Sequence, residues 1–341
     1  MGSYSRYLLP LQRLSPIYPG QLGVDGSDVP RGVQSVPGRK CFYVDHDHPD
    51  ASDAHDGVDP EHPKLTIQAA VDSPWLEAGD TIVVGPATPL PPVIGNILAP
   101  SYHENVVVAN TRPPFVSLMG CGGSRFHVVW NKLAAAVQTL PVLDLRQAGW
   151  TVSGFKFHAP ALAASILLND WLAVAPAIYS DSSLYTIIEG NLFDGAWTGL
   201  YGIALYGLGD RVIIKDNWFL EHGAGGATAI KGFLPGAQDL PYECIVEDNI
   251  FMENVNHVVC PFLCSLIRGN TFFTGNLIAA TLSLDLTGGG SNIVAGNVFQ
   301  GDYSNVGGYF AGAVDTWIGN LSADVAEAEV GDNGFTILPP A

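Results

Sequence analysis

The sequence predicts an all-β fold, a single-stranded right-handed parallel β-helix in which the chain winds into a solenoid of stacked coils. Two observations predict it. A short phrase returns along the second half of the chain, and each column of that phrase keeps one residue type. The regular copies carry Asn at an anchor position and Phe two residues later: Asn191 and Phe193, Asn217 and Phe219, Asn249 and Phe251, Asn270 and Phe272, Asn297 and Phe299.

The distance between successive copies fits the length of one coil. The five anchors are 26, 32, 21 and 27 residues apart. One solenoid coil commonly takes about 20–30 residues, and additional residues go into loops on one face. An earlier variant has Phe155 at the anchor, and an incomplete last copy ends at Asn320.

The columns of the phrase predict a bend at the anchor. A Val or Ile stands three residues before the anchor and the Phe stands two residues after it, as in Ile188 and Phe193. Positions five apart on an uninterrupted strand face opposite ways, so both reach the core only if the chain bends between them. Asn tolerates the left-handed conformation, so we expect the asparagines to form this bend and to hydrogen-bond in a ladder.

Alternating charges support the same register. Glu189, Lys215, Glu247 and Arg268 each stand two residues before an anchor. Adjacent coils would bring these side chains to the strand spacing of about 4.8 Å. Opposite charges at that spacing favour the correct register more than they add to stability.

The chain divides into four segments. Residues 1–40 contain five prolines and no periodic pattern, which predicts an extended arm. Residues 41–80 are expected to form an N-terminal cap with a short helix, because Ile67, Ala70 and Val71 have helical spacing. Residues 81–320 form the β-helix, and residues 321–341 form a C-terminal cap or tail. The first residues lack the pattern of a signal peptide, so we expect an unprocessed product.

Composition excludes several classes of function. The formal net charge of −18 disfavours binding to nucleic acid. No apolar run approaches the roughly 20 residues of a membrane-spanning helix, so no membrane partner is expected. The five cysteines form no CxxC pair, which argues against a disulfide framework and a zinc site and favours synthesis in a reducing cytoplasm.

The segment from Tyr43 to Val84 resembles the opening of the pectate-lyase-like right-handed β-helix superfamily. The residues that carry the resemblance are Tyr43-Val-Asp45, Ser52-Asp53, Asp56-Gly57, Pro60, Pro63, Thr66-Ile-Gln-Ala-Ala-Val-Asp72 and Ala78-Gly-Asp-Thr-Ile-Val-Val84. The resemblance covers about residues 41–320. It implies the fold, but not one function, because the superfamily includes lyases, glycosidases, phage tailspikes and non-catalytic virion proteins.

The arm, the compact helix and the incomplete last copy look most like virion β-helix proteins of tailed phages. This resemblance implies a non-enzymatic structural protein, such as a capsid decoration or tail component, found in the virion after synthesis in the host cytoplasm. Its partners would be other virion proteins and copies of itself, with a homotrimer favoured. Within the arm, the expected partner-binding residues are Arg6, Arg13, Leu14 and Tyr18.

The acidic residues offer two alternatives to a purely structural role, a metal site and a catalytic site. Hard oxygen ligands in a Gly-containing loop are typical of Ca²⁺ sites, and the candidate ligands are Asp45, Asp47, Asp53 and Asp56. The alternative for this segment is a solvated turn closed by Asp and Ser side chains. No other cofactor is expected.

A polysaccharide lyase, a glycosidase or a tailspike would need clustered carboxylates, and the weak candidates are Asp194, Asp216 and Asp248. Asp216 and Asp248 directly precede an anchor Asn, so turn capping also explains them. The acid motifs typical of polygalacturonase-like members are absent, and no residue is assigned as catalytic. A carbohydrate-binding adhesin is the third function considered, with Trp171 and Tyr179 as the aromatics expected to be exposed.

Overall fold

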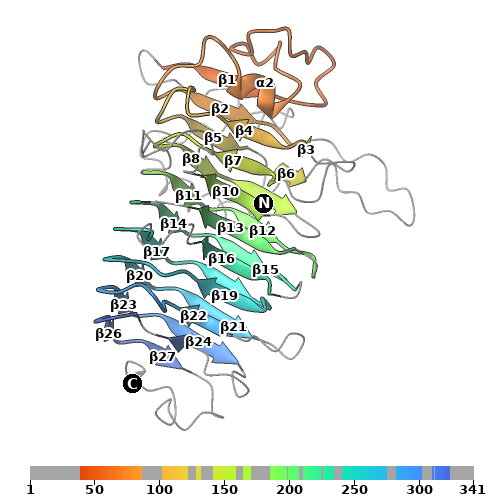
Figure 1. The fold of residues 1–341 in the computed structure, drawn as a ribbon. Coiled ribbons are helices and arrows are strands. Elements are labelled where there is room, and N and C mark those ends of the chain that lie inside the picture. The colour runs from red at the N-terminus through yellow and green to blue at the C-terminus, as the bar shows by residue number, and fades with distance from the viewer. Residues whose placement is uncertain are drawn as a thin grey trace, which may run out of the picture.

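The computed structural model describes residues 39–86, 102–121, 128–131, 141–158, 164–169, 185–197, 199–206, 210–223, 226–233, 240–274, 282–301, 309–310 and 312–322. These residues form three parallel sheets that run along one axis. Figure 1 shows the coils stacked from the orange N-terminal end to the blue C-terminal end. No helix among the described residues is long and apolar enough to cross a membrane.

The ten-stranded sheet contains the strands that precede each bend. In spatial order they are β1 (Cys41–Val44), β2 (Thr81–Val84), β5 (Ser117–Gly120), β8 (Thr151–Ser153), β11 (Ile187–Glu189), β14 (Ile213–Lys215), β17 (Ile245–Glu247), β20 (Leu266–Arg268), β23 (Ile293–Ala295) and β26 (Thr316–Ile318). The parallel ladder therefore begins at Cys41, inside the segment 41–80 that was expected to be a cap.

The nine-stranded sheet follows the bend. Its strands are β3 (Tyr102–His103), β6 (Val128–Asn131), β9 (Phe155–His158), β12 (Leu192–Asp194), β15 (Trp218–Leu220), β18 (Ile250–Met252), β21 (Thr271–Thr274), β24 (Val298–Gly301) and β27 (Leu321–Ser322).

The eight-stranded sheet completes each coil. Its strands are β4 (Val106–Val108), β7 (Leu143–Leu145), β10 (Ala164–Asn169), β13 (Tyr201–Tyr206), β16 (Thr228–Phe233), β19 (Asn256–Val259), β22 (Leu282–Asp285) and β25 (Tyr309–Phe310). From β2 to β25 each coil gives one strand to each sheet, and neighbouring coils pair in parallel. This topology confirms the predicted parallel β-helix.

A short helix, α2 (Ile67–Val71), packs at the N-terminal end of the solenoid beside β1 and β2 (Figure 1). The Thr66 side chain accepts a hydrogen bond from the backbone N–H of Ala69, which caps the first turn. The carboxylate of Glu104 accepts the N–H groups of Ile67 (2.8 Å) and Gln68 (3.0 Å). Ile67, Ala70 and Val71 are buried, which confirms the predicted helix.

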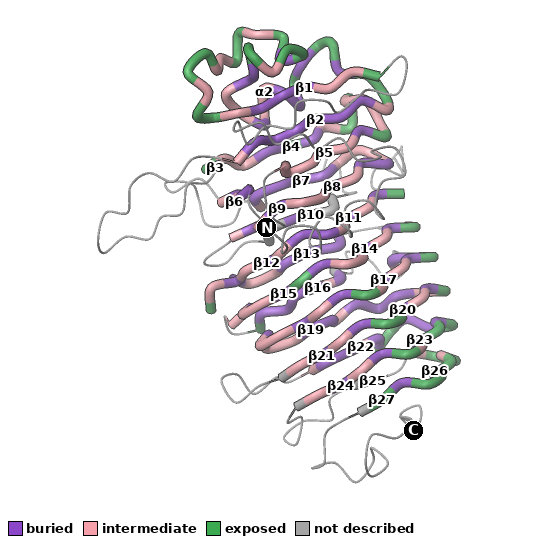
Figure 2. Tube along the Cα trace, turned by 180° about the vertical axis from the view of Figure 1, so that it is seen from behind, coloured by how far each residue is buried: buried purple, intermediate pink, exposed green. Residues whose placement is uncertain are grey.

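A stack of phenylalanine rings forms part of the core. The rings of Phe157, Phe193, Phe219, Phe251, Phe272 and Phe299 lie one above another, with centroids 4.7–5.1 Å apart and interplanar angles of 5–14°. The aliphatic residue before each bend, such as Ile188, is also buried. Figure 2 shows buried positions repeating along the strands of successive coils.

The anchor asparagines form a buried ladder. From Asn217 onward, the Oδ1 of each Asn accepts hydrogen bonds from both the backbone N–H and the Nδ2 of the Asn one coil earlier; for Asn249 these distances from Asn217 are 3.0 and 3.1 Å. The Nδ2 of Asn249 also donates to the backbone O of Ile214 (2.9 Å). The same contacts join Asn191 through Asn297 and end at Asn320.

The expectation that these asparagines adopt the left-handed conformation is wrong. The residue with positive φ is the one before the anchor: Gly154, Gly190, Asp216, Asp248, Gly269, Gly296 and Gly319. The physical reason is that the Asn side chain must point inward to bond the ladder. The preceding residue, whose side chain is a hydrogen or a short carboxylate, therefore supplies the bend.

Candidate functional site

A cluster of charged side chains lies where the nine-stranded sheet ends, and we call Lys156, His158, Asp194 and Glu221 the charge cluster. Asp194 closes β12, and its Oδ2 is 2.9 Å from Lys156 Nζ and 3.3 Å from His158 Nδ1, both on β9. Its Oδ1 accepts the backbone N–H of Ala196 at 3.0 Å. Partial burial acts to raise the pKa of Asp194, but the hydrogen bonds and charges of His158 and Lys156 outweigh it and hold the pKa far below its usual value.

Glu221 follows β15 on the next coil, and its pKa is shifted in the opposite direction. Partial burial raises the pKa of its carboxyl, and the charge of Asp194 raises it further, while Lys156 lowers it. The cluster thus shifts the pKa values of its two carboxyl groups in opposite directions. Carboxyl groups with oppositely shifted pKa values are also a feature of sites that use general acid–base chemistry on glycosidic bonds.

Two exposed tryptophans belong to the same region. Trp197 donates its backbone N–H to the backbone O of Glu221 (2.8 Å), and its side chain is 41% exposed. Trp218, on β15, is 37% exposed and pairs with Leu192 of β12. Exposed indole faces beside polar groups are suited to contact with sugar rings or protein side chains.

The other two candidate aspartates lie elsewhere. Asp216 and Asp248 occupy the bend between the ten- and nine-stranded sheets, at the opposite end of the strands from Asp194. Partial burial and the charges of Asp216 and Glu247 raise the pKa of Asp248. The fold therefore brings Asp216 and Asp248 together and separates both from the charge cluster.

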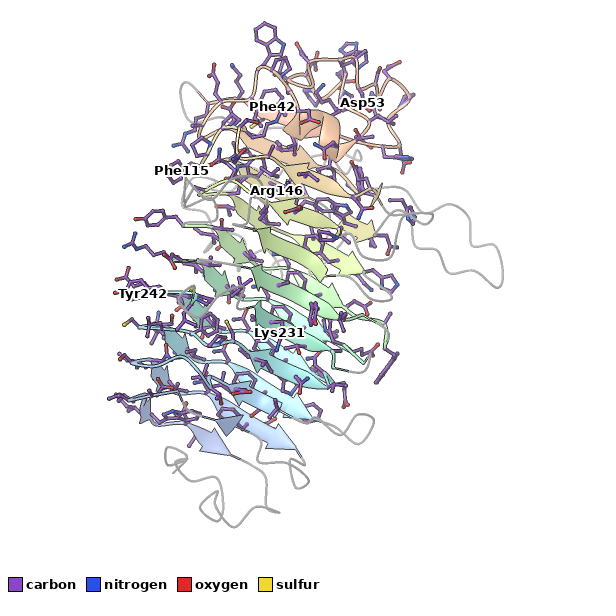
Figure 3. The ribbon with its side chains drawn as sticks, viewed as in Figure 1. Phe42, Asp53, Phe115, Arg146, Lys231 and Tyr242 are labelled. Atoms are coloured by element: carbon purple, nitrogen blue, oxygen red, sulfur yellow. The ribbon has the colours of Figure 1, made fainter. Side chains whose placement is uncertain are left out.

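The proposed calcium ligands are engaged in local hydrogen bonds. Asp53 accepts the N–H groups of Leu65 (3.1 Å) and Thr66 (2.9 Å) and the Thr66 hydroxyl (3.1 Å). Asp45 accepts the N–H of Asp47 and Asp56 that of Val58, both at 3.1 Å. Among the residues that the structure describes, no three His, Cys, Asp or Glu side chains form a group that could hold a metal ion. Figure 3 shows Asp53 in the loops near α2.

The outer face of the ten-stranded sheet carries an aliphatic column. Its members pair side by side in neighbouring coils and are Ile187, Ile213, Ile245, Leu266 and Ile293. The residues two positions later form the predicted charge ladder, with Lys215 Nζ 2.9 Å from Glu189 and Arg268 2.6 Å from Glu247. The ladder confirms the predicted register.

A second set of outward side chains lines the edge where each coil enters the ten-stranded sheet. Arg211 donates to the hydroxyl of Tyr185 (3.0 Å) and to Glu243 (2.7 Å), and its guanidinium lies 5.4 Å from the centre of the Tyr185 ring. Figure 3 shows Phe115 and Tyr242 at this same edge of the solenoid. Phe115 is 56% exposed.

Several sequence-based candidates lie outside the described residues. These are the arm residues Arg6, Arg13, Leu14 and Tyr18 and the loop aromatics Trp171 and Tyr179. Sequence reasoning also missed Lys156, His158 and Glu221 as neighbours of Asp194. The signal was present for His158, because it stands three residues after anchor position 155, as Asp194 stands three after Asn191.

No protein-family model matches the chain, and no curated protein sequence matches it either. Among solved structures, a rhamnogalacturonan lyase matches with a TM-score of 0.41 and 13% identity, over 81% of this chain and 86% of that one. A mannuronic acid specific polysaccharide family 6 lyase from human gut microbiota matches with a TM-score of 0.42 and 15% identity, over 74% of this chain and 61% of that one.

A mutant tailspike protein of E. coli bacteriophage HK620, in complex with pentasaccharide, matches with a TM-score of 0.36 and 11% identity. The match covers 74% of this chain and 56% of the tailspike. The assignment of a parallel β-helix rests on the strand pairing within this chain itself.

Proposed function

We propose that this chain is a non-enzymatic structural protein of a tailed-phage virion, a capsid decoration or tail component that reaches the virion after synthesis in the host cytoplasm. The aliphatic column on the outer face of the ten-stranded sheet carries the proposal. Its last member, Ile293, is 47% exposed, and the other four members are half-buried. A continuous apolar stripe on a rigid face is suited to burial against another protein.

The charge ladder beside this stripe adds specificity. Glu189, Lys215, Glu247 and Arg268 hold opposite charges at fixed spacing along the same face. Such a pattern favours one register of a partner and disfavours others through like-charge contacts. A second copy of this chain would present a matching pattern, and we propose a homotrimer as the assembled form.

The arm is proposed as the second attachment element. Residues 1–40 contain five of the 15 Lys and Arg residues but two of the 33 Asp and Glu residues. Arg6 and Arg13 would dock on acidic surface of a neighbouring copy or another virion protein. Leu14 and Tyr18 would supply apolar contacts along the same path.

The experiment combines particle incorporation with matched substitutions. The double variant Ile213→Ser, Ile245→Ser is expected to fold and to lose incorporation into particles that lack the protein. Ile250→Ser, on the outer face of the nine-stranded sheet, is the control and is expected to incorporate as the parent does. Full incorporation of the double variant, with circular dichroism unchanged, would remove the basis of the proposal.

A second candidate function, cleavage or binding of a glycan, is favoured by one specific observation. The opposite pKa shifts of Asp194 and Glu221 occur beside the exposed Trp197. We expect no product from polygalacturonate, alginate or bacterial surface polysaccharides, with or without calcium. Asp194 is already bonded to Lys156 and His158, which disfavours its action as an acid or a nucleophile.

Asp194→Asn and Glu221→Gln test this second candidate. Product release by the parent that disappears in both variants would establish the enzyme and overturn the non-enzymatic proposal. Asp216→Asn is the control, because Asp216 lies at the other end of the strand. Glycan binding without turnover, lost in Trp197→Ala, would instead identify an adhesin.

A further inference from the structure

A polar triad lies inside the apolar core, where the nine-stranded sheet turns into the eight-stranded sheet. His222 follows β15, Asn254 follows β18 on the next coil, and His257 belongs to β19. Their exposed fractions are 1%, 0% and 0%. The His257 ring lies 5.9 Å from the ring centres of both Phe251 and Phe272, so the triad touches the phenylalanine stack.

Two backbone contacts fix the orientation of the Asn254 amide. Its Oδ1 accepts the backbone N–H of His222 at 3.1 Å, and its Nδ2 donates to the backbone O of Phe219 at 3.0 Å. A flipped amide would place a donor against the N–H and an acceptor against the carbonyl. The amide therefore has one orientation compatible with both neighbours.

The amide in turn fixes the tautomer of each histidine. Asn254 Oδ1 lies 2.7 Å from His222 Nδ1. Because the amide oxygen can only accept, His222 Nδ1 must carry a proton and donate it. Asn254 Nδ2 lies 3.1 Å from His257 Nδ1. Because the amide nitrogen can only donate, His257 Nδ1 must be unprotonated and accept the hydrogen bond. A proton added to His257 Nδ1 would face a donor, and it would place a charged imidazolium in the buried core.

The charged groups around the triad do not offset its burial. Burial lowers the pKa of His222 to about 4, although the hydrogen bond to Asn254 and the charge of Asp194 both act to raise it. Burial and the nearby His222 lower the pKa of His257 to about 3. Glu221 and Glu253 directly precede His222 and Asn254 on half-exposed turns. Lys231 and Asp285 flank β19 in register with Val259, which points outward.

We infer that His222, Asn254 and His257 form a proton-sensitive lock, which holds this turn closed while both imidazoles are neutral and releases it when they take up protons. The inference concerns stability against acid and does not depend on the proposed virion role. The segments held are 221–223 and 253–257, and His257 in the second segment contacts Phe251 and Phe272 of the stack. Opening there would expose the stack in the middle of the solenoid.

The direction of the effect follows from proton linkage. An opened turn exposes both histidines to water, where their pKa is about 6.5, whereas the closed turn binds their protons only near pH 4 and 3. The closed state is therefore fully favoured above pH 6.5 and loses stability as the pH falls below it. Each histidine increases the opening constant by up to about tenfold per pH unit down to about pH 4.

Amide hydrogen exchange measures this opening. The reporter amides are Val255, which donates to His222 O (2.9 Å), and Asn256, which donates to Ala227 O (3.1 Å). After correction for intrinsic exchange, their opening constants are expected to rise steeply between pH 6.5 and 4. The amide of Ile213, bonded to Thr186 O in the ten-stranded sheet, is expected to stay constant over that range.

Substitution separates the lock from a general effect of acid. His257→Leu removes one titrating group and is expected to reduce the pH slope by up to about tenfold per pH unit, while the exposed His103→Gln keeps the parent slope. Equal slopes in the parent and His257→Leu would overturn the inference. Should His257→Leu fail to fold, nitrogen chemical shifts of the parent imidazoles decide. Neutral His222 with a proton on Nδ1 and neutral His257 with a proton on Nε2 at pH 5 support the lock, and pKa values near 6.5 would overturn it.

Discussion

Left-handed backbone conformations recur in successive coils before the anchor and before the strands of the ten-stranded sheet, and different residue types occupy these two places. Before the anchor the residue is Gly or Asp. Two residues before β2 and β8 the residue is Gly, but before β5 and from β11 onward larger side chains adopt positive φ, among them Phe115, Tyr185 and the exposed Val314. Hydrogen bonds between coils hold this second position; for example, the Glu243 N–H donates to Leu263 O at 3.0 Å. These contacts offset a strain of about 1–2 kcal/mol per residue.

Gly296→Ala isolates the backbone cost at the first of these places. Gly296 has φ +62, and nothing lies within 4 Å of an added Cβ. The free energy of unfolding should therefore fall by about 1–2 kcal/mol from strain alone. Gly296→Asp should cost less, because Asp216 and Asp248 adopt this conformation in other coils. Denaturant titration of both variants checks the order, and equal losses would contradict it.

The asparagine ladder makes a second residue-scale prediction. Asn249→Leu removes the acceptor of the Asn217 N–H and Nδ2 and the donor to Ile214 O. Several buried groups then lack partners, so the free energy of unfolding should drop by about 3 kcal/mol or more. Thermal and denaturant unfolding provide the measurement. The exposed Asn110→Leu serves as the control, and a similar loss in both variants would show that the ladder contributes nothing.

At the scale of the element, each strand after the bend places one side chain in the core and its neighbours on the outer face. Phe251 of β18 is fully buried between Phe219 and Phe272, at 4.8 and 4.9 Å. Its neighbours in the strand, Ile250 and Met252, face outward and are half-buried. Because each inner column repeats in every coil, the core of one element is completed by the coils above and below it.

Phe251→Ala tests this dependence on neighbouring coils. The cavity would leave Phe219 and Phe272 without a stacking partner, and the expected loss is about 3–5 kcal/mol in the free energy of unfolding. Phe273→Ala is the matched control, because Phe273 lies on the outer face of β21 in register with Met252. The control should lose clearly less. Equal melting temperatures for parent and Phe251→Ala would contradict the stacked core.

At the scale of the whole molecule, the side chains that stabilise the solenoid lie inside it, and those available for contact with a partner lie outside. The inner columns and the Asn ladder join successive coils on the inside, while the aliphatic column, the charge ladder and the charge cluster lie on the outside. Contacts between adjacent coils carry the stability, so outer side chains can vary without loss of the fold.

Deletion of residues 2–38 tests the arm at this scale. The described body begins at residue 39 and contains the stack and the ladder, so the truncated chain is expected to stay folded. It is expected to lose co-sedimentation with particles that lack the protein, because the basic and apolar arm would no longer dock. Circular dichroism of both forms is the control. A folded truncated chain that incorporates fully would show that the arm is not the attachment element.

The sequence by itself determined the repeat, the inward columns, the charge register and α2. Each of these depends on residues a few positions apart, such as Ile188, Asn191 and Phe193, whose spacing and side-chain chemistry are visible in the chain. The position of the left-handed residue was not determined, because both Asn and its predecessor tolerate that conformation. The choice between them depends on which side chain the core can satisfy.

Only the tertiary structure decided which distant side chains meet. Lys156 and Asp194 are 38 positions apart, and His222 and His257 are 35 apart, across coils of unequal length. Their contact depends on how many residues each loop contains before the chain returns to the next strand of the sheets. Burial then set their chemistry: the same residue type is an exposed side chain at His103 and a neutral member of the core at His257. Desolvation is a property of the packed molecule, so no local pattern could reveal it.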